Sequence, residues 1–296
     1  MMDVLLPRTL HEALAMKADH PDVVPIAGGT DLMVDLNFDR RRPSSLMDVS
    51  RLRDLGEWRR EDGHLFLGAG VTYTRIVEEL GAFPPLVQAS RTVGSPQIRN
   101  RATVGGNLGT ASPAGDALPV LAAYGADVVL QSARGARTLP WAQFLTGPKR
   151  NALGPDELIL GVRWRIARGA GSFSKVGPRN AMVIAVASLC LILDEERREV
   201  RVALGSVGPT ILRAHEAETR VARAIVDAGV WDDPVRELPP QAVETFAAGV
   251  AAAAQPIDDV RGTASYRRHA CGILARRALA WALADRRAGS GPARPR

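Results

Sequence analysis

The chain has 296 residues, of which 46% are hydrophobic and 24% charged, a composition typical of a folded globular protein rather than a disordered one. Its net charge is +6, but the arginines lie in scattered pairs and one triplet without interleaved aromatic residues, so we expect no nucleic-acid partner. No segment approaches the roughly 18 consecutive apolar residues of a membrane span, and residues 1–7 lack the basic and apolar regions of a signal peptide. We therefore expect a cytoplasmic protein with no membrane span.

Strand and helix patterns alternate in the first part of the chain. We expect a strand near Val4, a helix over 9–20, a strand over 23–26, a helix over 32–38, strands over 45–49 and 65–69, helices over 72–80, 84–93 and 117–124, and strands over 127–131 and 158–165.

The later part of the chain has longer apolar runs, followed by segments with helical spacing. Two long apolar strands, 181–194 and 200–207, flank a charged turn and predict a hairpin. Helical spacing follows over 211–226, 240–254 and 265–285. Alanine and glycine interrupt both patterns between residues 167 and 171. We therefore expect a first domain over 1–168, with subdomains of about 1–55 and 56–168, a second domain over 169–286, and a flexible tail over 287–296.

A glycine pair, Gly28-Gly29, stands between the strand ending near Ile26 and the helix beginning near Leu32. Glycine reaches positive φ at little cost and lets backbone N–H groups approach an anion. With Thr30 as the expected N-cap, the helix start would offer further N–H groups to a phosphate or diphosphate. A single pair of this kind is also common as a plain connection between elements.

The pair recurs as Gly105-Gly106, in what we expect to be a second turn. Asn107, Thr110 and Ser112 follow and can hydrogen-bond a sugar or a phosphate. Asp116 precedes the helix over 117–124, where its carboxylate can either contact a ligand or cap the helix. Because the chain has neither a P-loop motif nor the three-glycine dinucleotide fingerprint, we expect neither of those nucleotide-binding folds.

Other catalytic and metal-binding signals are weak. Cys190 lies in an apolar run and Cys271 in a helical pattern, so we expect both thiols to be buried and reduced. None of the five histidines stands at metal-ligand spacing, and there is no G-x-S-x-G nucleophile motif. The sequence predicts no metal site and no catalytic acid or base on this chain.

The two glycine motifs carry a family resemblance. Ala27-Gly28-Gly29-Thr30-Asp31-Leu32 and Thr103-Val104-Gly105-Gly106-Asn107, followed by Ala111-Ser112-Pro113 and Asp116, closely resemble the FAD-binding medium subunit of molybdenum hydroxylases, a family that includes the flavoprotein subunits of xanthine dehydrogenase and carbon monoxide dehydrogenase. The likeness continues through 156–159, 173–175 with Arg179, 256–262 and 266–268. It implies an α+β fold, with a two-subdomain FAD-binding domain of the PCMH/vanillyl-alcohol-oxidase type and a smaller C-terminal domain of an antiparallel sheet with helices.

The resemblance also implies a set of residues that bind FAD. They are Ile26, Ala27, Gly28, Gly29, Thr30, Asp31 and Leu32 around the diphosphate, Thr103, Gly106, Asn107, Thr110 and Asp116 along the ribityl, phosphate and adenosine parts, Ile159 or Leu160 against a ring, and Lys175 near the polar edge of the flavin. Without the resemblance, Lys175 is interpreted as an exposed strand lysine. Relatives that bind flavin covalently carry a histidine in the region of Thr30, so we expect non-covalent FAD.

Two positions depart from the family pattern. Val183 stands where many members carry an acidic residue, and Val93 stands where some relatives place an aromatic side chain against the flavin. Neither a polar pairing from position 183 nor stacking from position 93 is therefore expected of these side chains.

The implied function is electron transfer, as an oxidoreductase subunit. A large partner subunit would hold the molybdenum cofactor and a small one two [2Fe–2S] clusters, and FAD on this chain would pass the electrons to an external acceptor. With two cysteines, this chain cannot supply the thiolates of such clusters. The expected assembly is a heterotrimer or its dimer. Two alternatives are a self-sufficient FAD-dependent oxidoreductase of the same wider fold and a non-catalytic scaffold subunit that has lost flavin.

Overall fold

The structure, a computed structural model, describes residues 2–289, and its internal contacts divide the chain into two units. Unit 1 comprises the chain up to Glu79 together with Val93–Ser112 and Gly125–Arg165. Unit 2 comprises Leu80–Thr92, Pro113–Tyr124 and the chain from Ile166 onward. Residues 290–296 of the expected tail lie outside the described residues, whereas Arg287 still belongs to the last helix.

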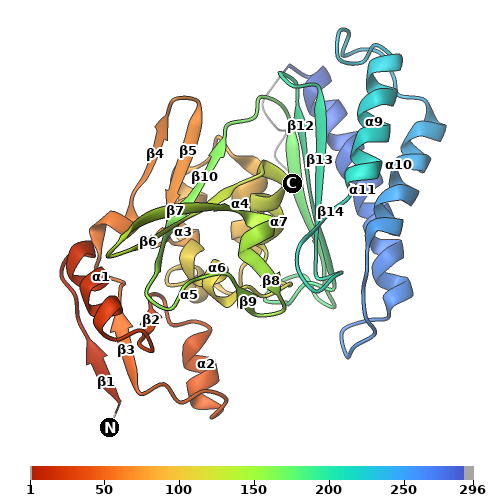
Figure 1. The fold of residues 1–296 in the computed structure, drawn as a ribbon. Coiled ribbons are helices and arrows are strands. Elements are labelled where there is room, and N and C mark those ends of the chain that lie inside the picture. Colours follow the sequence, from red (N-terminus) through yellow and green to blue (C-terminus); the bar gives the residue numbers. More distant parts are fainter. Residues whose placement is uncertain (1, 290–296) are drawn as a thin grey trace. The chain divides into compact units, whose positions relative to one another are not determined.

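The N-terminal part of unit 1 is a small parallel sheet with two helices (Figure 1). Strands β1 (Asp3–Leu5), β3 (Ser45–Asp48) and β2 (Val24–Ile26) lie in that order. Helix α1 (Leu10–Asp19) begins where the Thr9 hydroxyl accepts a hydrogen bond from the Glu12 N–H, 3.1 Å away. Helix α2 (Leu32–Asn37) follows β2 after the first glycine pair. This part therefore sets the glycine pair between a strand end and a helix start.

The rest of unit 1 is built on a five-stranded antiparallel sheet in the order β4-β5-β10-β6-β7. Its strands are β4 (Trp58–Glu61), β5 (His64–Gly68), β6 (Asp127–Ser132), β7 (Gly135–Pro140) and β10 (Leu158–Arg165). Alternate residues such as Leu65, Val128 and Trp164 are buried, as expected of a sheet with one covered face. The shorter elements of this part are η1 (Arg53–Gly56), α3 (Tyr73–Glu79), α5 (Pro96–Arg99), α6 (Val104–Thr110), α8 (Trp141–Phe144), β8 (Leu145–Gly147) and β9 (Arg150–Asn151).

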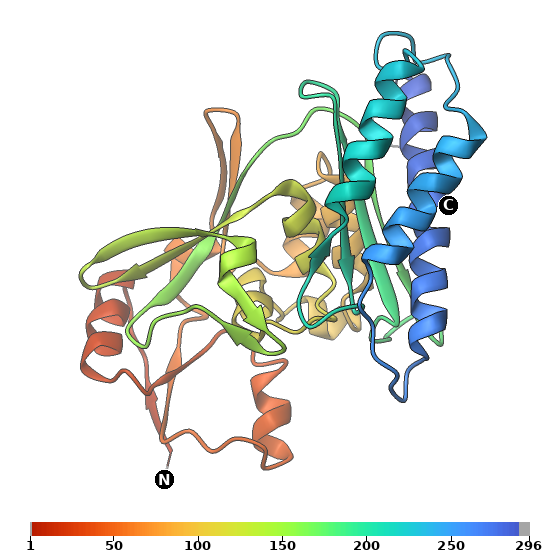
Figure 2. The ribbon, with the colours of Figure 1, turned by 45° about the vertical axis from the view of Figure 1, so that its right-hand side comes forward.

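Unit 2 is a four-stranded antiparallel sheet with helices on both faces (Figures 1 and 2). Its strands are β11 (Gly171–Val176), β12 (Ala187–Asp194), β13 (Glu199–Gly205) and β14 (Leu212–Arg213). Leu189, Leu191 and Leu193 of β12 point into a core shared with α9 (His215–Asp227), α10 (Pro240–Ala253) and α11 (Ala264–Arg287). The other face carries α4 (Pro84–Thr92) and α7 (Ala117–Tyr124), and all eight residues of α7 are buried.

Most expected elements are present within a few residues, and the predicted hairpin is confirmed by the pairing of Asp194 with Glu199. Two predicted starts are wrong. The strand predicted from residue 181 begins at Ala187, because the Arg179 guanidinium donates to the Ala181 and Met182 carbonyls and holds these residues in a turn. The helix predicted from residue 211 begins at His215, because Leu212 and Arg213 pair with β13.

Helix content also differs around the second glycine pair. Residues 104–110 form α6 rather than a turn, because the Thr103 hydroxyl accepts the Gly106 N–H at 3.0 Å and begins the helix. Among residues 2–289, none of the helices combines the length and apolar character that a bilayer crossing requires.

Candidate functional site

The loop over residues 26–32 needs both of its glycines. A Cβ added to Gly28 would lie 1.8 Å from the carbonyl oxygen of Arg101, so only glycine fits this close approach of two backbone segments. Gly29 has φ of +73°, a left-handed conformation that glycine adopts without a steric penalty. The pair therefore fixes the course of the chain between β2 and α2.

This loop presents a row of backbone N–H groups. From Ala27 to Leu32, six consecutive amides donate no hydrogen bond to any other residue of the described chain, and all of these residues except the exposed Asp31 are half-buried. Unpaired backbone donors beside a helix start favour an anionic ligand. The loop therefore fits a diphosphate.

The start of α2 differs from the prediction. Its N-cap is Asp31 rather than Thr30, and the Asp31 side chain makes no capping hydrogen bond. Instead, Asp31 Oδ2 accepts a hydrogen bond from Thr110 Oγ1 at 3.1 Å. This contact joins the first motif to the end of α6.

The first turn of α6 has no spare amides, unlike the loop over residues 27–32. The Val104 N–H donates to the Val71 carbonyl at 3.1 Å, and the Gly105 N–H donates to the Ala69 carbonyl at 2.7 Å. The Gly106 N–H is taken by the Thr103 hydroxyl. The second motif therefore offers a surface and side chains to a ligand, rather than backbone donors.

The glycines of α6 divide by what surrounds them. A Cβ on Gly105 would lie 2.6 Å from that of Ala69, so this residue is needed for packing. A Cβ on Gly106 would meet only Thr103 Oγ1 at 3.1 Å, and one on Gly109 only Ile159 Cδ1 at 3.9 Å. Gly106 and Gly109 thus leave bare backbone on one side of the helix, open to a ligand.

Asn107 supplies an unused polar atom at the same helix. Its Oδ1 is buried and has no hydrogen-bond partner among the described residues. Buried polar atoms are nearly always paired in native proteins, so an unpaired one marks a place for a ligand or water. This is a second observation that fits a bound nucleotide at α6.

Ile159 and Leu160 of β10 complete the assembly of predicted residues in unit 1. A bulge between Ile159 and Gly161 interrupts the pairing of β10 with β6. Ile159 lies beside Gly109, whereas Leu160 packs with Ala27 against the core of the small parallel sheet. Unit 1 thus brings both glycine motifs and this strand together.

Asp116 and Lys175 form a buried ion pair in unit 2. Lys175 Nζ donates to Asp116 Oδ2 at 2.7 Å, to the Thr92 carbonyl at 2.9 Å and to the Val183 carbonyl at 3.0 Å. The two side chains are 7% and 8% exposed, so the interpretation of Lys175 as a surface lysine is wrong. Asp116 pairs with Lys175 and with the Thr92 hydroxyl, which contradicts the capping alternative.

This pair leaves one polar atom free. Burial raises the pKa of the Asp116 carboxyl, although Lys175 and Thr92 act to lower it. The three protons of the Lys175 ammonium are used by three protein oxygens, whereas Asp116 Oδ1 is buried without a partner in the described chain. Any contact from this pair to a ligand is therefore available from Asp116 rather than from Lys175.

Several contacts of the site were not predictable from motifs. The Arg101 carbonyl sets the position of Gly28, and Thr92 holds both members of the ion pair. Val183, where the sequence departs from the family pattern, contributes its backbone carbonyl instead of a side chain. These partners are remote in sequence, and no local pattern marks them.

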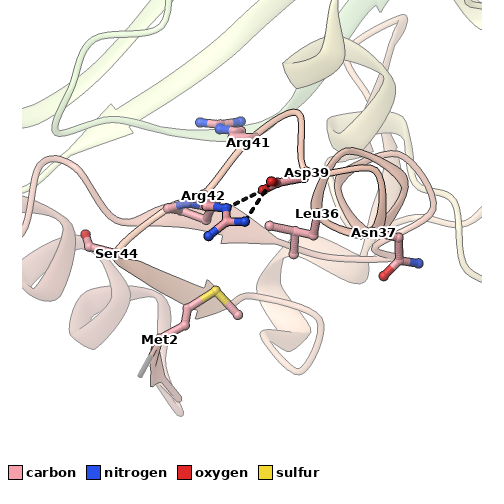
Figure 3. Close-up of a pocket in the computed structure, with 8 residues that line it drawn as sticks. Met2, Leu36, Asn37, Asp39, Arg41, Arg42 and Ser44 are labelled. Carbon is pink, nitrogen blue, oxygen red and sulfur yellow. Dashed lines mark hydrogen bonds and ion pairs between the residues drawn. The ribbon is translucent and has the colours of Figure 1, made fainter.

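Other features lie apart from these residues. A pocket of about 620 Å³ at the end of α2 is lined by residues that include Met2, Leu36 and Arg41 (Figure 3). Cys190 and Cys271 are buried free thiols, and burial raises the pKa of Cys271 to about 12. Residues 2–289 contain no cluster of three or more His, Cys, Asp or Glu side chains that could hold a metal ion.

Comparison with known families gives this geometry its context. Residues 1–164 match the family model described as the FAD binding domain in molybdopterin dehydrogenase. The chain belongs to this family. Residues 172–282 match a second model, the CO dehydrogenase flavoprotein C-terminal domain. The predicted family, its α+β fold class, FAD as its cofactor and its place as an oxidoreductase subunit are thereby confirmed.

Individual members of the family cover much of the chain. A caffeine dehydrogenase subunit beta from Pseudomonas sp. (strain CBB1) is 36% identical over 225 residues, which are 73% of this chain and 76% of that protein. A nicotinate dehydrogenase FAD-subunit from Eubacterium barkeri is 37% identical over 190 residues, 61% of this chain and 64% of that subunit, less than two thirds of its length. A solved carbon monoxide dehydrogenase from Hydrogenophaga pseudoflava superposes with a TM-score of 0.82 at 26% identity, over 96% of this chain and 97% of that one.

Proposed function

We propose that the chain is the electron-transferring FAD subunit of a molybdenum-containing hydroxylase or dehydrogenase. The observation that carries the proposal is the row of six unpaired amides in the loop over 27–32, in a chain of this family. FAD, when bound, accepts electrons from one centre and passes them to another. The solved relative is described as a carbon monoxide dehydrogenase that lacks the Mo-pyranopterin moiety of the molybdenum cofactor, and an enzyme that can lack this moiety is one that otherwise holds it, which supports a molybdenum partner.

The residues have distinct roles in this proposal. The backbone from Ile26 to Leu32 binds the diphosphate, because two negative charges need several N–H donors and this loop has them to spare. Asn107 and Thr110 hydrogen-bond the ribityl and phosphate parts, Gly106 lets the ligand approach α6, and Thr103 holds that helix start. Ile159 or Leu160 contacts a ring of the cofactor.

The buried pair acts as one group at the polar edge of the flavin. Lys175 orients Asp116 and balances its charge, and the free Oδ1 of Asp116 accepts a hydrogen bond from the cofactor. The carboxylate therefore contacts FAD directly, and the lysine acts through it and through its field.

Partner subunits supply the other redox centres. In this proposal a large subunit carries the molybdenum cofactor and a small one carries the [2Fe–2S] clusters, as the family of the chain implies. Electrons then leave through FAD to an external acceptor. We also propose residues 1–168 as the FAD-binding half and 169–286 as the C-terminal domain, in line with the ranges of the two family models.

A matched pair of glycine variants tests the diphosphate role. Gly29→Val and Gly63→Val each place a β-branched residue at nearly the same positive φ, +73° and +71°, but Gly63 lies in the β4–β5 turn with open space around it. We expect the Gly29 variant to lose FAD and the Gly63 variant to keep it, measured as flavin absorbance after gel filtration. A Gly29 variant with full flavin absorbance would remove the diphosphate from this loop.

Two further measurements separate the alternatives. Acid precipitation of the holoprotein should leave yellow colour in the supernatant, because no covalent bond holds the cofactor; colour in the pellet would refute this. Reduction of the isolated chain's FAD by a small organic substrate would favour a self-sufficient oxidoreductase. Wild-type protein that stays colourless after addition of FAD would favour a scaffold without flavin.

A further inference from the structure

A side-chain hydrogen bond joins the two glycine motifs of unit 1. Thr110 Oγ1, at the end of α6, lies 3.1 Å from Asp31 Oδ2, in the loop of unpaired amides. A carboxylate has no hydrogen to give, so the hydroxyl of Thr110 is the donor of this bond. The one hydrogen of that hydroxyl is therefore used, and only its lone pairs remain for a ligand.

Asp31 is likewise left with acceptors alone. Its Oδ1 accepts no hydrogen bond within residues 2–289, and its carboxylate forms no ion pair with any residue of that range. The side chain also caps no amide of α2. Asp31 and Thr110 together thus present oxygen lone pairs and one negative charge, and no hydrogen-bond donor.

This pair borders both parts of the candidate FAD site. Residues three and four positions apart share a helix face, so Thr110 lies on the face of Gly106 and Asn107. That face has bare backbone at Gly106 and the buried Oδ1 of Asn107, which has no partner among the described residues. Asp31 itself belongs to the row of six unpaired amides, so its carboxylate stands within about 6 Å of the neighbouring N–H groups.

Oxygen acceptors recognise hydroxyl groups and repel phosphate oxygens. A sugar hydroxyl can donate to Asp31 Oδ1 or to Thr110 Oγ1, whereas a phosphate oxygen would meet lone pairs and a like charge. A phosphate esterified on both sides carries one negative charge, whereas a terminal phosphate carries about 1.5 to 2 at neutral pH. The amides of the loop attract both kinds of phosphate, so only the side chains can discriminate between them.

We propose that Asp31 and Thr110 determine the class of nucleotide that the chain accepts. They select a diphosphate bonded to a hydroxyl-bearing sugar at both ends, as in FAD, and they reject a diphosphate that ends in a free phosphate, as in ADP. The proposal rests on the proposed function, in which this loop binds the diphosphate of FAD. It adds the two side chains that keep other nucleotides off the same amides.

ADP and ADP-ribose are the matched probes of this pair. They share adenosine and a diphosphate, and they differ in whether the far phosphate is free or bonded to ribose. Their affinities for the flavin-free full chain are measured by calorimetry, and competition with FAD shows that both occupy the flavin site. The wild type should bind ADP-ribose at least about tenfold more tightly than ADP, because a hydroxyl group suits the acceptors and a second phosphate charge does not.

Two variants should change this preference from opposite sides. Asp31→Asn keeps an acceptor for the Thr110 hydroxyl but removes the charge and adds amide hydrogens, so the affinity for ADP should rise about tenfold. Thr110→Val removes the hydroxyl at nearly constant volume, so the affinity for ADP-ribose should fall about fivefold while ADP stays weakly bound.

Asp62→Asn is the matched control for the loss of one carboxylate. Asp62 lies in the turn between β4 and β5 (Figure 1), with a φ of +49° that asparagine tolerates. It forms no ion pair within the described chain. Both affinities should stay at their wild-type values in this variant.

Three results would overturn the proposal while both probes displace FAD. They are equal wild-type affinities for ADP and ADP-ribose, an Asp31→Asn chain that keeps the wild-type preference, and an Asp62→Asn chain that loses it. Failure of the proposed function looks different. Wild-type protein that takes up no FAD, or whose FAD neither probe displaces, would show that the loop does not hold a diphosphate.

Discussion

Substitution of two glycines by alanine should separate the packing role of the first motif from the ligand role of the second. In Gly28→Ala the new Cβ would lie 1.8 Å from the oxygen and 2.4 Å from the carbon of the Arg101 carbonyl, both of them backbone atoms. One of the two segments must retreat by well over an ångström. Overpacking of this kind costs about 1–3 kcal/mol, which lowers Tm by roughly 2–12 °C in a domain of this size class.

Gly106→Ala should act in the opposite direction on stability. Its Cβ would meet only Thr103 Oγ1 at 3.1 Å, and alanine in a helix is more stable than glycine by about 0.5–1 kcal/mol. The same methyl group occupies the bare side of α6, so FAD affinity should fall about tenfold, equivalent to about 1.4 kcal/mol.

Thermal melts of the flavin-free proteins and titrations with FAD measure the two effects separately. We expect Gly28→Ala to lower Tm and Gly106→Ala to keep or raise it while weakening FAD binding. A Gly28→Ala protein with wild-type Tm would refute the close approach to Arg101. An unchanged FAD affinity in Gly106→Ala would refute the assignment of a ligand to that side of α6.

Three more predictions concern the buried pair and the α6 cap. Lys175→Met leaves the Asp116 carboxylate buried without a counter-charge and should destabilise the chain by about 3–5 kcal/mol, measured by urea unfolding. Adding Asp116→Leu to this variant should recover part of the lost unfolding free energy. A double variant that is destabilised by the sum of the two single variants would contradict the pairing. Burial raises the pKa of Asp116, so there is a pH range in which the folded chain keeps the carboxyl proton and the unfolded chain has lost it. The contribution of Asp116 to the unfolding free energy should therefore fall as the pH rises from the ordinary aspartate range to the raised pKa. Subtraction of the pH–stability curve of Asp116→Asn isolates this contribution, and a contribution that rises with pH would refute the reasoning. Thr103→Ala should cost about 1 kcal/mol by removing the cap of α6 while Thr103→Ser retains it, and equal Tm values for the two variants would exclude the capping role.

Elements with a strong periodic pattern were predictable from sequence. The β12–β13 hairpin and α7 follow from long apolar runs that end at charged or glycine-containing turns. Strand β7, with the sequence GARTLP, was missed, since all but one of its residues are exposed and its pairing with β6 is what makes it a strand. Helix α6 was missed for a related reason, because its two adjacent glycines lower helix propensity and only the Thr103 cap and packing on Ala69 offset this.

The site shows the same division between local and remote causes. The glycine loop before α2 was predictable, because strand, glycine pair and helix start are contiguous in sequence. Asp31 with Thr110, and Asp116 with Lys175, are contacts between residues far apart in the chain, and sequence pattern alone carries no information on them. The family resemblance named these residues without indicating which of them contact one another.

The discontinuity of unit 2 has a consequence for biogenesis. Helices α4 and α7 leave the ribosome well before β11, β12 and β13, the strands on which they pack. Until those strands are synthesised, the apolar side chains of α7, all buried in the finished protein, have no native surface to cover them. The first half of this polypeptide therefore cannot complete its folding until these strands have emerged, and a nascent chain stalled near its middle is expected to expose α7 to chaperones.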